Sequence, residues 1–166
     1  MGARLEQVAG DPAGRGAVLI VRGPVVTLPQ AQSAALLFGR FRDSDDGEGK
    51  QLIVYLEQAS MATYVMACAA DKVAVAPLTS WDVFGLRAAP TFLKDTLAKF
   101  GVEFDVVKIA QTKTAADTLS RSAMSEEHRQ QLSRLLDSLY EEAVSSISNG
   151  RGHAEDVVAS LIDDAP

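Results

Sequence analysis

Residues 51–76 read QLIVYLEQASMATYVMACAADKVAVA, which is an apolar strand, an apolar helix and a second, shorter strand. The apolar run Gln51–Leu56 is typical of a buried strand. Ser60–Asp71 is rich in alanine and methionine and apolar nearly all round, which predicts a fully buried helix with Ser60 as its N-cap. Lys72–Ala76 alternates weakly and stops before a proline, so it predicts a short strand.

Similar signals flank this stretch on both sides. Apolar runs predict further strands, and apolar residues at helical spacing predict further helices. The strands are expected at Ala17–Arg22, Trp81–Leu86 and Phe104–Ile109, and the helices at Pro29–Phe41, Pro90–Phe100, Ser125–Asn149 and Ala154–Ile162. We expect Ala17–Arg22 to be buried on both faces and Ser125 to cap the longest helix. The alternation of strands and helices predicts an α/β layered fold with a mainly parallel sheet.

Length and charge set the broad class of the chain. Its 166 residues are enough for one domain with a real core. Residues 1–16, rich in glycine, alanine and charge, are expected to be a flexible lead-in, and residues 17–166 a single domain. A net charge of −6 and a pI of about 4.9 argue against a nucleic-acid partner and against adhesion to anionic lipid.

The sequence contains no signal for membrane insertion. The longest mainly apolar run, Met61–Ala70, has about half the length that a spanning helix needs. The first residues resemble neither a signal peptide nor a myristoylation site. We therefore expect a soluble chain, or one cut from a larger protein. Its single cysteine, Cys68, cannot form an intramolecular disulfide and is interpreted as buried filler.

Most standard catalytic and binding motifs are missing. The chain has no glycine-rich phosphate loop and no Gly-x-Ser-x-Gly turn. His128 and His153 have no cysteine or carboxylate at metal-ligand spacing, so we expect both to be solvated and expect no metal and no cofactor. The acidic residues Asp43, Asp45, Asp46 and Glu48 predict a solvated loop; calcium binding is possible there, although the spacing lacks the EF-hand order.

Lys113 is the residue whose position suggests chemistry. It follows the apolar run Phe104–Ile109 in a short polar turn, before a long polar stretch that leads into a helix. A lysine just past a strand end can point into a cleft, where burial lowers its pKa and makes it a usable base. The alternative is a solvated loop lysine. A lysine base needs no histidine, because a neutral amine can take the proton of a serine.

Four segments, in order, resemble the signal peptide peptidase A (protease IV) family. They are Ala69-Ala70-Asp71-Lys72-Val73 with a following Pro77, the segment Phe92–Phe104, the turn Thr112-Lys113-Thr114-Ala115, and Met124-Ser125-Glu126-Glu127 with a long helix and Gly150-Arg151-Gly152. The resemblance covers about three fifths of the chain. It implies a crotonase-like or ClpP-like α/β fold, and it places Lys113 on the general base of the family.

The chain departs from the family at the nucleophile. The family's serine motif aligns with Met61, and Ser60 lies one residue away, which corresponds to a turn of about 100° on a helix. Capping the helix is the simpler role for Ser60. The strand that supplies the family's oxyanion hole is also missing, so the resemblance implies a reduced fold that lacks one core strand region.

This pattern resembles the N-terminal, lysine-bearing half of the tandem members, possibly incomplete at its C-terminus. It implies a serine-bearing second domain or subunit as partner, peptide substrates and a homo-oligomer. It also implies a full-length protein that is cytoplasmic or membrane-associated. Two alternatives stay open: a non-catalytic oligomerisation or scaffold module, and a self-contained dyad of Ser60 and Lys113.

Overall fold

The computed structural model describes residues 1–23, 26–43, 49–106 and 116–164. They form two compact units, one made of Met1–Gly85 with Glu142–Pro166 and the other of Leu86–Glu141. The single domain expected over residues 17–166 stays a prediction, because a division by contacts does not define a folding unit.

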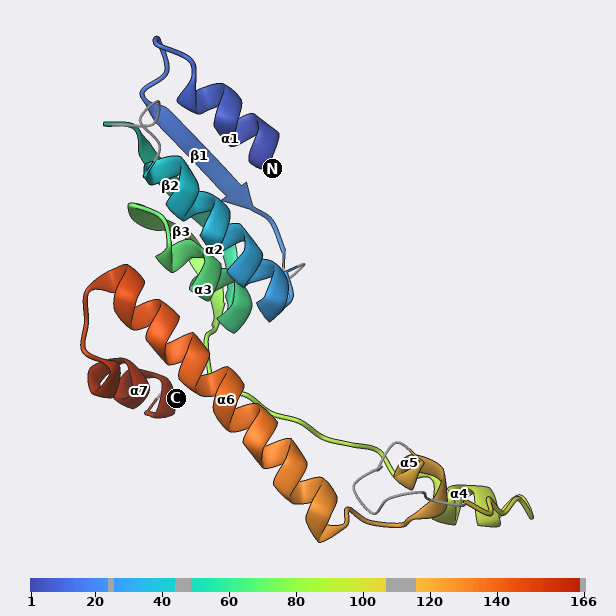
Figure 1. Ribbon diagram of the computed structural model, residues 1–166. Coiled ribbons are helices and arrows are strands. Elements are labelled where there is room, and N and C mark those ends of the chain that lie inside the picture. The colour runs from blue at the N-terminus through green and yellow to red at the C-terminus, as the bar shows by residue number, and fades with distance from the viewer. Residues whose placement is uncertain (24–25, 44–48, 107–115, 165–166) are drawn as a thin grey trace. The chain divides into compact units, whose positions relative to one another are not determined.

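A parallel sheet forms the centre of the first unit. Its strands are β1 (Gly16–Val21), β2 (Gln51–Ser60) and β3 (Lys72–Asp82), in the order β1-β2-β3 (Figure 1). Both pairings are parallel, with Leu19 opposite Val54 and Val54 opposite Val73. The three-stranded parallel sheet with its helices confirms the predicted layered α/β class. The crotonase-like or ClpP-like form, with one strand region missing, stays a prediction.

Helices α2 (Leu28–Arg42) and α3 (Met61–Cys68) pack side by side over one face of this sheet (Figure 1). Leu52, Val54 and Leu56 alternate along β2 and are fully buried on that face. Phe38 of α2 and Met66 of α3 are also buried. Burying each such side chain contributes about 1.5–3 kcal/mol, so this layer is the main core of the unit.

The other face of the sheet is open among the described residues. Val18 and Ile20 of β1 are 63% and 51% exposed, and their partners Ile53 and Tyr55 on β2 are half-buried. The prediction that β1 is buried on both faces is therefore wrong. A continuous apolar run does not reveal on which side a neighbouring layer is present. We call Val18, Ile20, Ile53 and Tyr55 the open sheet face.

Asp71 connects three elements of the first unit. Its Oδ2 accepts a hydrogen bond of 2.8 Å from the Leu52 N–H at the start of β2. Its Oδ1 lies 3.0 Å from Nε of Arg42, the last residue of α2. Asp71 itself lies between α3 and β3, so one carboxylate joins the end of α2, the start of β2 and the turn before β3.

Residues Gly2–Ala9 form helix α1, which differs from the flexible lead-in expected for residues 1–16. The Lys50 ammonium donates hydrogen bonds to the carbonyls of Val8, Ala9 and Asp11 at the end of this helix. Carbonyls at a helix C-terminus lack intrahelical partners and carry partial negative charge. A lysine about forty residues away in sequence therefore fixes a segment whose composition alone suggests disorder.

Strand β3 is longer than predicted. It continues through Pro77 to Asp82, where the sequence indicated one strand to Ala76 and another from Trp81. The pairing with β2 shifts between Leu56 and Gln58, and Leu78 takes a positive φ of 63°. Pro77 therefore lies next to an irregularity in the pairing, and such irregularities are among the places in a sheet where proline is tolerated.

The C-terminal segment returns to this unit. The end of α6 (Glu126–Arg151) and α7 (Glu155–Asp163) belong to it, and Ala143, Val144, Ile147, Val158 and Ile162 are buried. Gly150 lies against α3, where a Cβ atom would come within 2.2 Å of the Cys68 carbonyl oxygen. The two predicted C-terminal helices are confirmed, with boundaries within a few residues.

The second unit contains α4 (Lys94–Ala98), α5 (Asp117–Ser120) and the first part of α6. Ser125 caps α6 through its Oγ, which accepts a 3.2 Å hydrogen bond from the His128 N–H. The helix predicted over Pro90–Phe100 is only five residues long, and none of its side chains is buried. Helices in proteins gain most of their stability from packing, and this helix has little packing to extend it. Residues 104–106 are not in a strand, and the rest of the strand predicted at Phe104–Ile109 lies outside the described residues.

Candidate functional site

Ser60 caps helix α3 and is engaged by Thr63 in four ways. The Thr63 N–H donates to Ser60 Oγ at 3.3 Å, and the Ser60 N–H donates to Thr63 Oγ1 at 2.8 Å. The Thr63 hydroxyl also donates to the Ser60 carbonyl at 3.1 Å, and the two hydroxyl oxygens lie 3.2 Å apart. This reciprocal capping box confirms the predicted N-cap role of Ser60.

Met61, which the sequence resemblance is expected to place on the family's nucleophile, is the first residue of the helix. Its side chain is buried, and the Thr63 side chain two residues on is fully buried. A thioether has no proton to give up and does not form an ester with a peptide carbonyl. At the start of α3, the Ser60 hydroxyl is therefore used to cap the helix, and the Met61 side chain is packed in the core.

Lys113 lies outside the described residues, so the structure gives no distance between it and Ser60. The nearest described residues on its C-terminal side are Ala116 and Asp117. Asp117 begins α5 and is fully buried. A buried carboxylate four residues after Lys113 was not singled out from the sequence, where Asp117 looks like one more polar residue of the stretch before the helix.

Cys68 is a protonated thiol in the core rather than a nucleophile. Burial raises its pKa to about 11, and this outweighs the lowering effects of the Tyr64 hydroxyl and the Arg151 guanidinium. Burial also raises the pKa of Tyr64, with Cys68 adding to the effect. At neutral pH the thiolate is scarce, which agrees with the interpretation of Cys68 as filler.

The two histidines differ in their surroundings. His153 is exposed. His128 is half-buried, its ring meets the Phe92 ring edge-on with centroids 6.2 Å apart, and its Nδ1 is buried without a hydrogen-bond partner in the described part of the chain. The expectation that His128 is solvated is therefore wrong, because α6 turns this residue toward the segment before α4 within the same unit.

The part of the chain that the structure describes, residues 1–23, 26–43, 49–106 and 116–164, has neither a metal-binding cluster nor a membrane-spanning helix. Within those ranges no three His, Cys, Asp or Glu side chains lie where they could hold a metal ion together. Asp45, Asp46 and Glu48 of the acidic cluster lie outside them. No described helix has both the length and the apolar character needed to cross a membrane.

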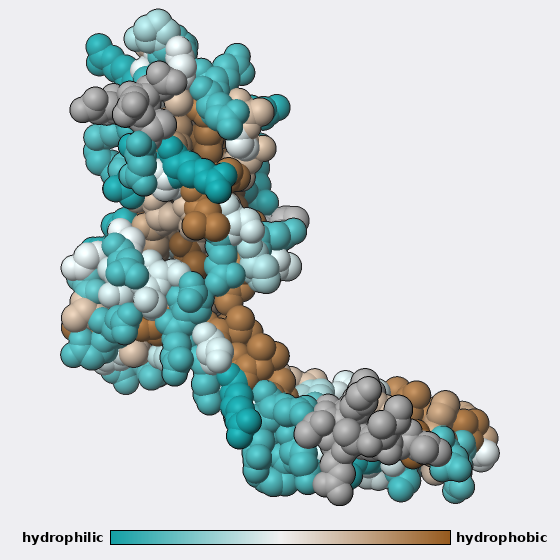
Figure 2. Space-filling model, viewed as in Figure 1, coloured by the Kyte–Doolittle hydropathy of each residue, from teal (hydrophilic) through white to brown (hydrophobic). Residues whose placement is uncertain are grey.

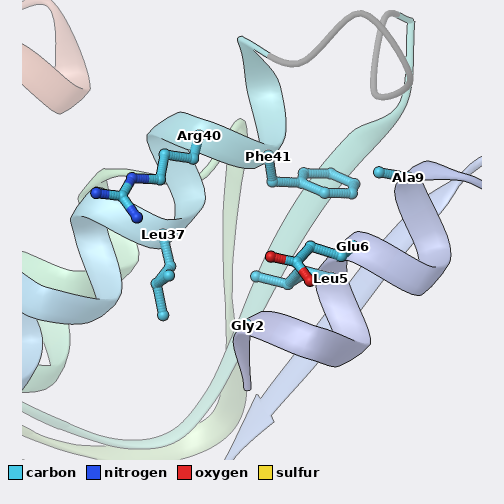
Figure 3. A pocket seen from close by; sticks show the side chains of 7 residues that line it. All are labelled: Gly2, Leu5, Glu6, Ala9, Leu37, Arg40 and Phe41. Carbon is cyan, nitrogen blue, oxygen red and sulfur yellow. The ribbon is translucent and has the colours of Figure 1, made fainter.

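A groove between α1 and α2 has a cavity volume of about 280 Å³ (Figure 3). Figure 3 shows the Phe41 ring pointing toward Ala9, with Leu5 and Leu37 completing an apolar lining and Glu6 and Arg40 beside it. Sequence reasoning missed this groove because it depends on α1 being ordered. Its lining contains no serine, lysine, histidine or cysteine, so it has no group suited to peptide hydrolysis.

Comparisons with known proteins match this chain to a peptidase family and to two proteases. A sequence model described as "Peptidase family S49" matches residues 44–165. The chain is 31% identical over 114 residues to "Serine protease SPPA, chloroplastic" of Arabidopsis thaliana, a match that covers 69% of the chain and 17% of that protein. It is 26% identical over 153 residues to "Protease 4" of Haemophilus influenzae, which covers 92% of the chain and 24% of that protein. The chain thus spans about a quarter or less of the length of these relatives.

Proposed function

Because the chain belongs to peptidase family S49, we propose that it is the lysine-bearing part of a serine peptidase with a Ser–Lys dyad. In this proposal Lys113 is the general base, and the nucleophilic serine comes from a second domain or subunit. The substrates are peptides. The names of the two relatives, both proteases, support the general class of activity.

The observation that carries the proposal is the start of helix α3. Met61, at the position of the family's serine, is buried, and the neighbouring Ser60 hydroxyl is held by Thr63. The family match nevertheless spans residues 44–165, a range that includes Lys113. In this proposal the chain has the base and lacks the nucleophile, so the nucleophile comes from a second domain or subunit.

In the proposed reaction, Lys113 carries one proton from the serine hydroxyl to the leaving amine. As the partner's serine Oγ attacks the peptide carbonyl carbon, the neutral Nζ of Lys113 takes the hydroxyl proton. The resulting ammonium gives this proton to the leaving amine when the C–N bond breaks. Water then hydrolyses the ester by the same route. The partner also has to supply oxyanion donors and close over the lysine, since a solvated amine stays protonated at neutral pH.

Complementation tests this proposal. A serine-bearing half from a family member is co-expressed with the wild-type chain, with Lys113→Ala, or with Lys99→Ala as a matched control. Lys99 is an exposed lysine at the end of α4. We expect hydrolysis of a fluorogenic peptide with the wild type and with Lys99→Ala, and a loss of at least about 100-fold with Lys113→Ala. Equal activity of all three chains would refute the role of Lys113.

A non-catalytic scaffold is the second candidate function. The open sheet face favours it, because Val18 and Ile20 leave apolar surface for another chain to cover. In that case the chain forms dimers or larger rings without taking part in chemistry. Size-exclusion chromatography with light scattering distinguishes the states, and a clean monomer at micromolar concentration counts against the scaffold.

The self-contained dyad of Ser60 and Lys113 is a third possibility. It requires the Ser60 hydroxyl to leave Thr63 and attack a substrate. A fluorophosphonate probe that labels the wild type but not Ser60→Ala supports this dyad, and an absence of labelling excludes it.

A further inference from the structure

A second cleft in the first unit adjoins the start of α3, because Tyr64 lies in the first turn of that helix and Trp81 pairs with Ala59 just before Ser60. It has a volume of about 390 Å³, within the range of small-ligand sites. Tyr64 and Trp81 form one wall, their rings packed edge-on with centroids 5.1 Å apart. Val83, Ile147 and Ile162 are buried and make an apolar floor.

Two exposed residues with N–H donors line this cleft. Arg151, the last residue of α6, and His153, in the turn before α7, both line it. Among the described residues the Arg151 guanidinium forms no ion pair, whereas Arg22 and Arg42 each have a carboxylate partner. The guanidinium lies close enough to lower the pKa of Tyr64 and Cys68, which places it toward the aromatic wall.

We propose that this cleft binds the free C-terminal end of a peptide whose last side chain is apolar. The apolar side chain rests between the aromatic wall and the floor, and the carboxylate meets the fork of N–H donors on Arg151. His153 can add one further N–H donor. The choice of a peptide rather than a fatty acid rests on the proposed function, because a peptidase releases new C-terminal ends.

The turn between α6 and α7 is built so that these donors stay in place. Gly152 adopts a positive φ of 68°, and its N–H bonds to the Ser148 carbonyl at 2.8 Å. The Ser148 hydroxyl in turn donates to the His153 carbonyl. Both contacts close the end of α6, so Arg151 and His153 project from a turn with fixed backbone rather than from a loose loop.

Trp81 provides a direct test, because it is the only tryptophan of the chain and lines the cleft. The Lys113→Ala chain, which cannot use the proposed base, is titrated with N-acetyl-Leu-Leu as the free acid, with the same peptide as its C-terminal amide, and with octanoate. We expect a saturable change of Trp81 emission with the free acid. The amide should bind about tenfold more weakly, since it lacks the charge-assisted hydrogen bonds.

Two variants make the test specific. Arg151→Gln should weaken binding of the free acid about tenfold and leave binding of the amide unchanged. Arg134→Gln, an exposed arginine in the part of α6 that belongs to the other unit, is the control and should change nothing. Circular dichroism confirms that both variants fold.

Three outcomes overturn the proposal: no saturable response, equal affinity for acid and amide, or octanoate binding more tightly than the peptide acid. The last would make the cleft a fatty-acid site. None of them affects the role proposed for Lys113, which the complementation assay measures separately, so failure of one proposal is distinguishable from failure of the other.

Discussion

Asp71 shows how one side chain can explain a family motif. It belongs to the segment Ala69–Val73, and its carboxylate accepts the Leu52 N–H and faces Arg42. Leu52 is fully buried, so its N–H has little access to water if the carboxylate is removed. The motif therefore has a structural role that is independent of catalysis.

The Asp71→Ala variant should lose about 1–3 kcal/mol of unfolding free energy in urea, because it leaves this N–H without its acceptor. The matched control is Glu57→Ala, which removes an ion pair with Arg22 whose side chains are 42% and 74% exposed. That loss should stay below about 1 kcal/mol, since solvent screens such pairs. Equal losses in the two variants would contradict the role assigned to Asp71.

Cys68 gives a pH dependence with a definite sign. Its pKa is raised from 9.0 to about 11 in the folded chain, so the folded state favours the neutral thiol. The stabilisation is present in full below pH 9 and is lost as the pH rises through 11. From the shift it amounts to about 2–3 kcal/mol, read as an order of magnitude.

Urea midpoints measured between pH 8 and 11 should therefore fall more steeply for the wild type than for Cys68→Ala. The pKa of Tyr64 is also raised. Tyr64 is present in both chains, so its contribution to the pH dependence cancels in the comparison only if Cys68→Ala leaves its surroundings unchanged. Tyr64→Phe in both backgrounds separates the two groups. Parallel pH profiles of wild type and Cys68→Ala would rule out the raised pKa.

At the scale of elements, helix α1 depends on a single distant side chain. Lys50 donates to carbonyls at the end of α1, and the helix itself has only eight residues, too few to be stable alone. Its packing on α2 and β1 is modest, with Ala9 as its only buried residue. We therefore expect the packing of α1 on the rest of the unit to depend on the hydrogen bonds from Lys50.

Lys50→Met should increase amide hydrogen exchange over residues 2–9 by about 10-fold or more, while exchange in β2 changes little. Lys99→Met, at an exposed lysine of the other unit, is the control and should leave exchange in α1 at the wild-type level. Unchanged exchange in Lys50→Met would mean that apolar packing alone holds the helix.

The elements that sequence predicts well are those with a strong local pattern. Helices α2, α3 and α6 were found because their apolar spacing and the caps Ser60 and Ser125 are local signals. The exposure of β1, the short α4 and the order of α1 were missed, because each depends on what packs against it. Likewise, the sequence identifies Ser60 as a cap, but only the fold reveals the buried Asp117 and the cleft beside Trp81.

At the scale of the whole molecule, the first unit joins segments far apart in the sequence. Residues 142–164 belong to the same unit as α3, and Gly150 lies against Cys68 at the end of that helix, so the C-terminal segment is part of the unit's packing. The surface in Figure 2 shows apolar side chains gathered along the part of this unit built on the sheet and α3. Gly150 and the Cys68 carbonyl lie so close together that this contact leaves no room for a side chain at position 150.

Gly150→Ala should therefore destabilise the chain, although alanine favours helices. Its Cβ would lie 2.2 Å from the Cys68 carbonyl oxygen, and both atoms belong to helices that cannot move independently of their packing. Overpacking costs about 1–3 kcal/mol. Because the clash is with a backbone atom at 2.2 Å, we expect a cost in the upper part of that range, above the gain of about 1 kcal/mol from replacing a helical glycine. Gly39→Ala is the matched control, because Gly39 lies in α2 with no atom within 4 Å of the added Cβ.

Thermal unfolding should give Gly150→Ala a lower melting temperature than the wild type, and Gly39→Ala a melting temperature equal to or above it. If Gly150→Ala were as stable as Gly39→Ala, the C-terminal segment would not pack on α3 in solution, and the cleft that shares this junction would lose its structural basis.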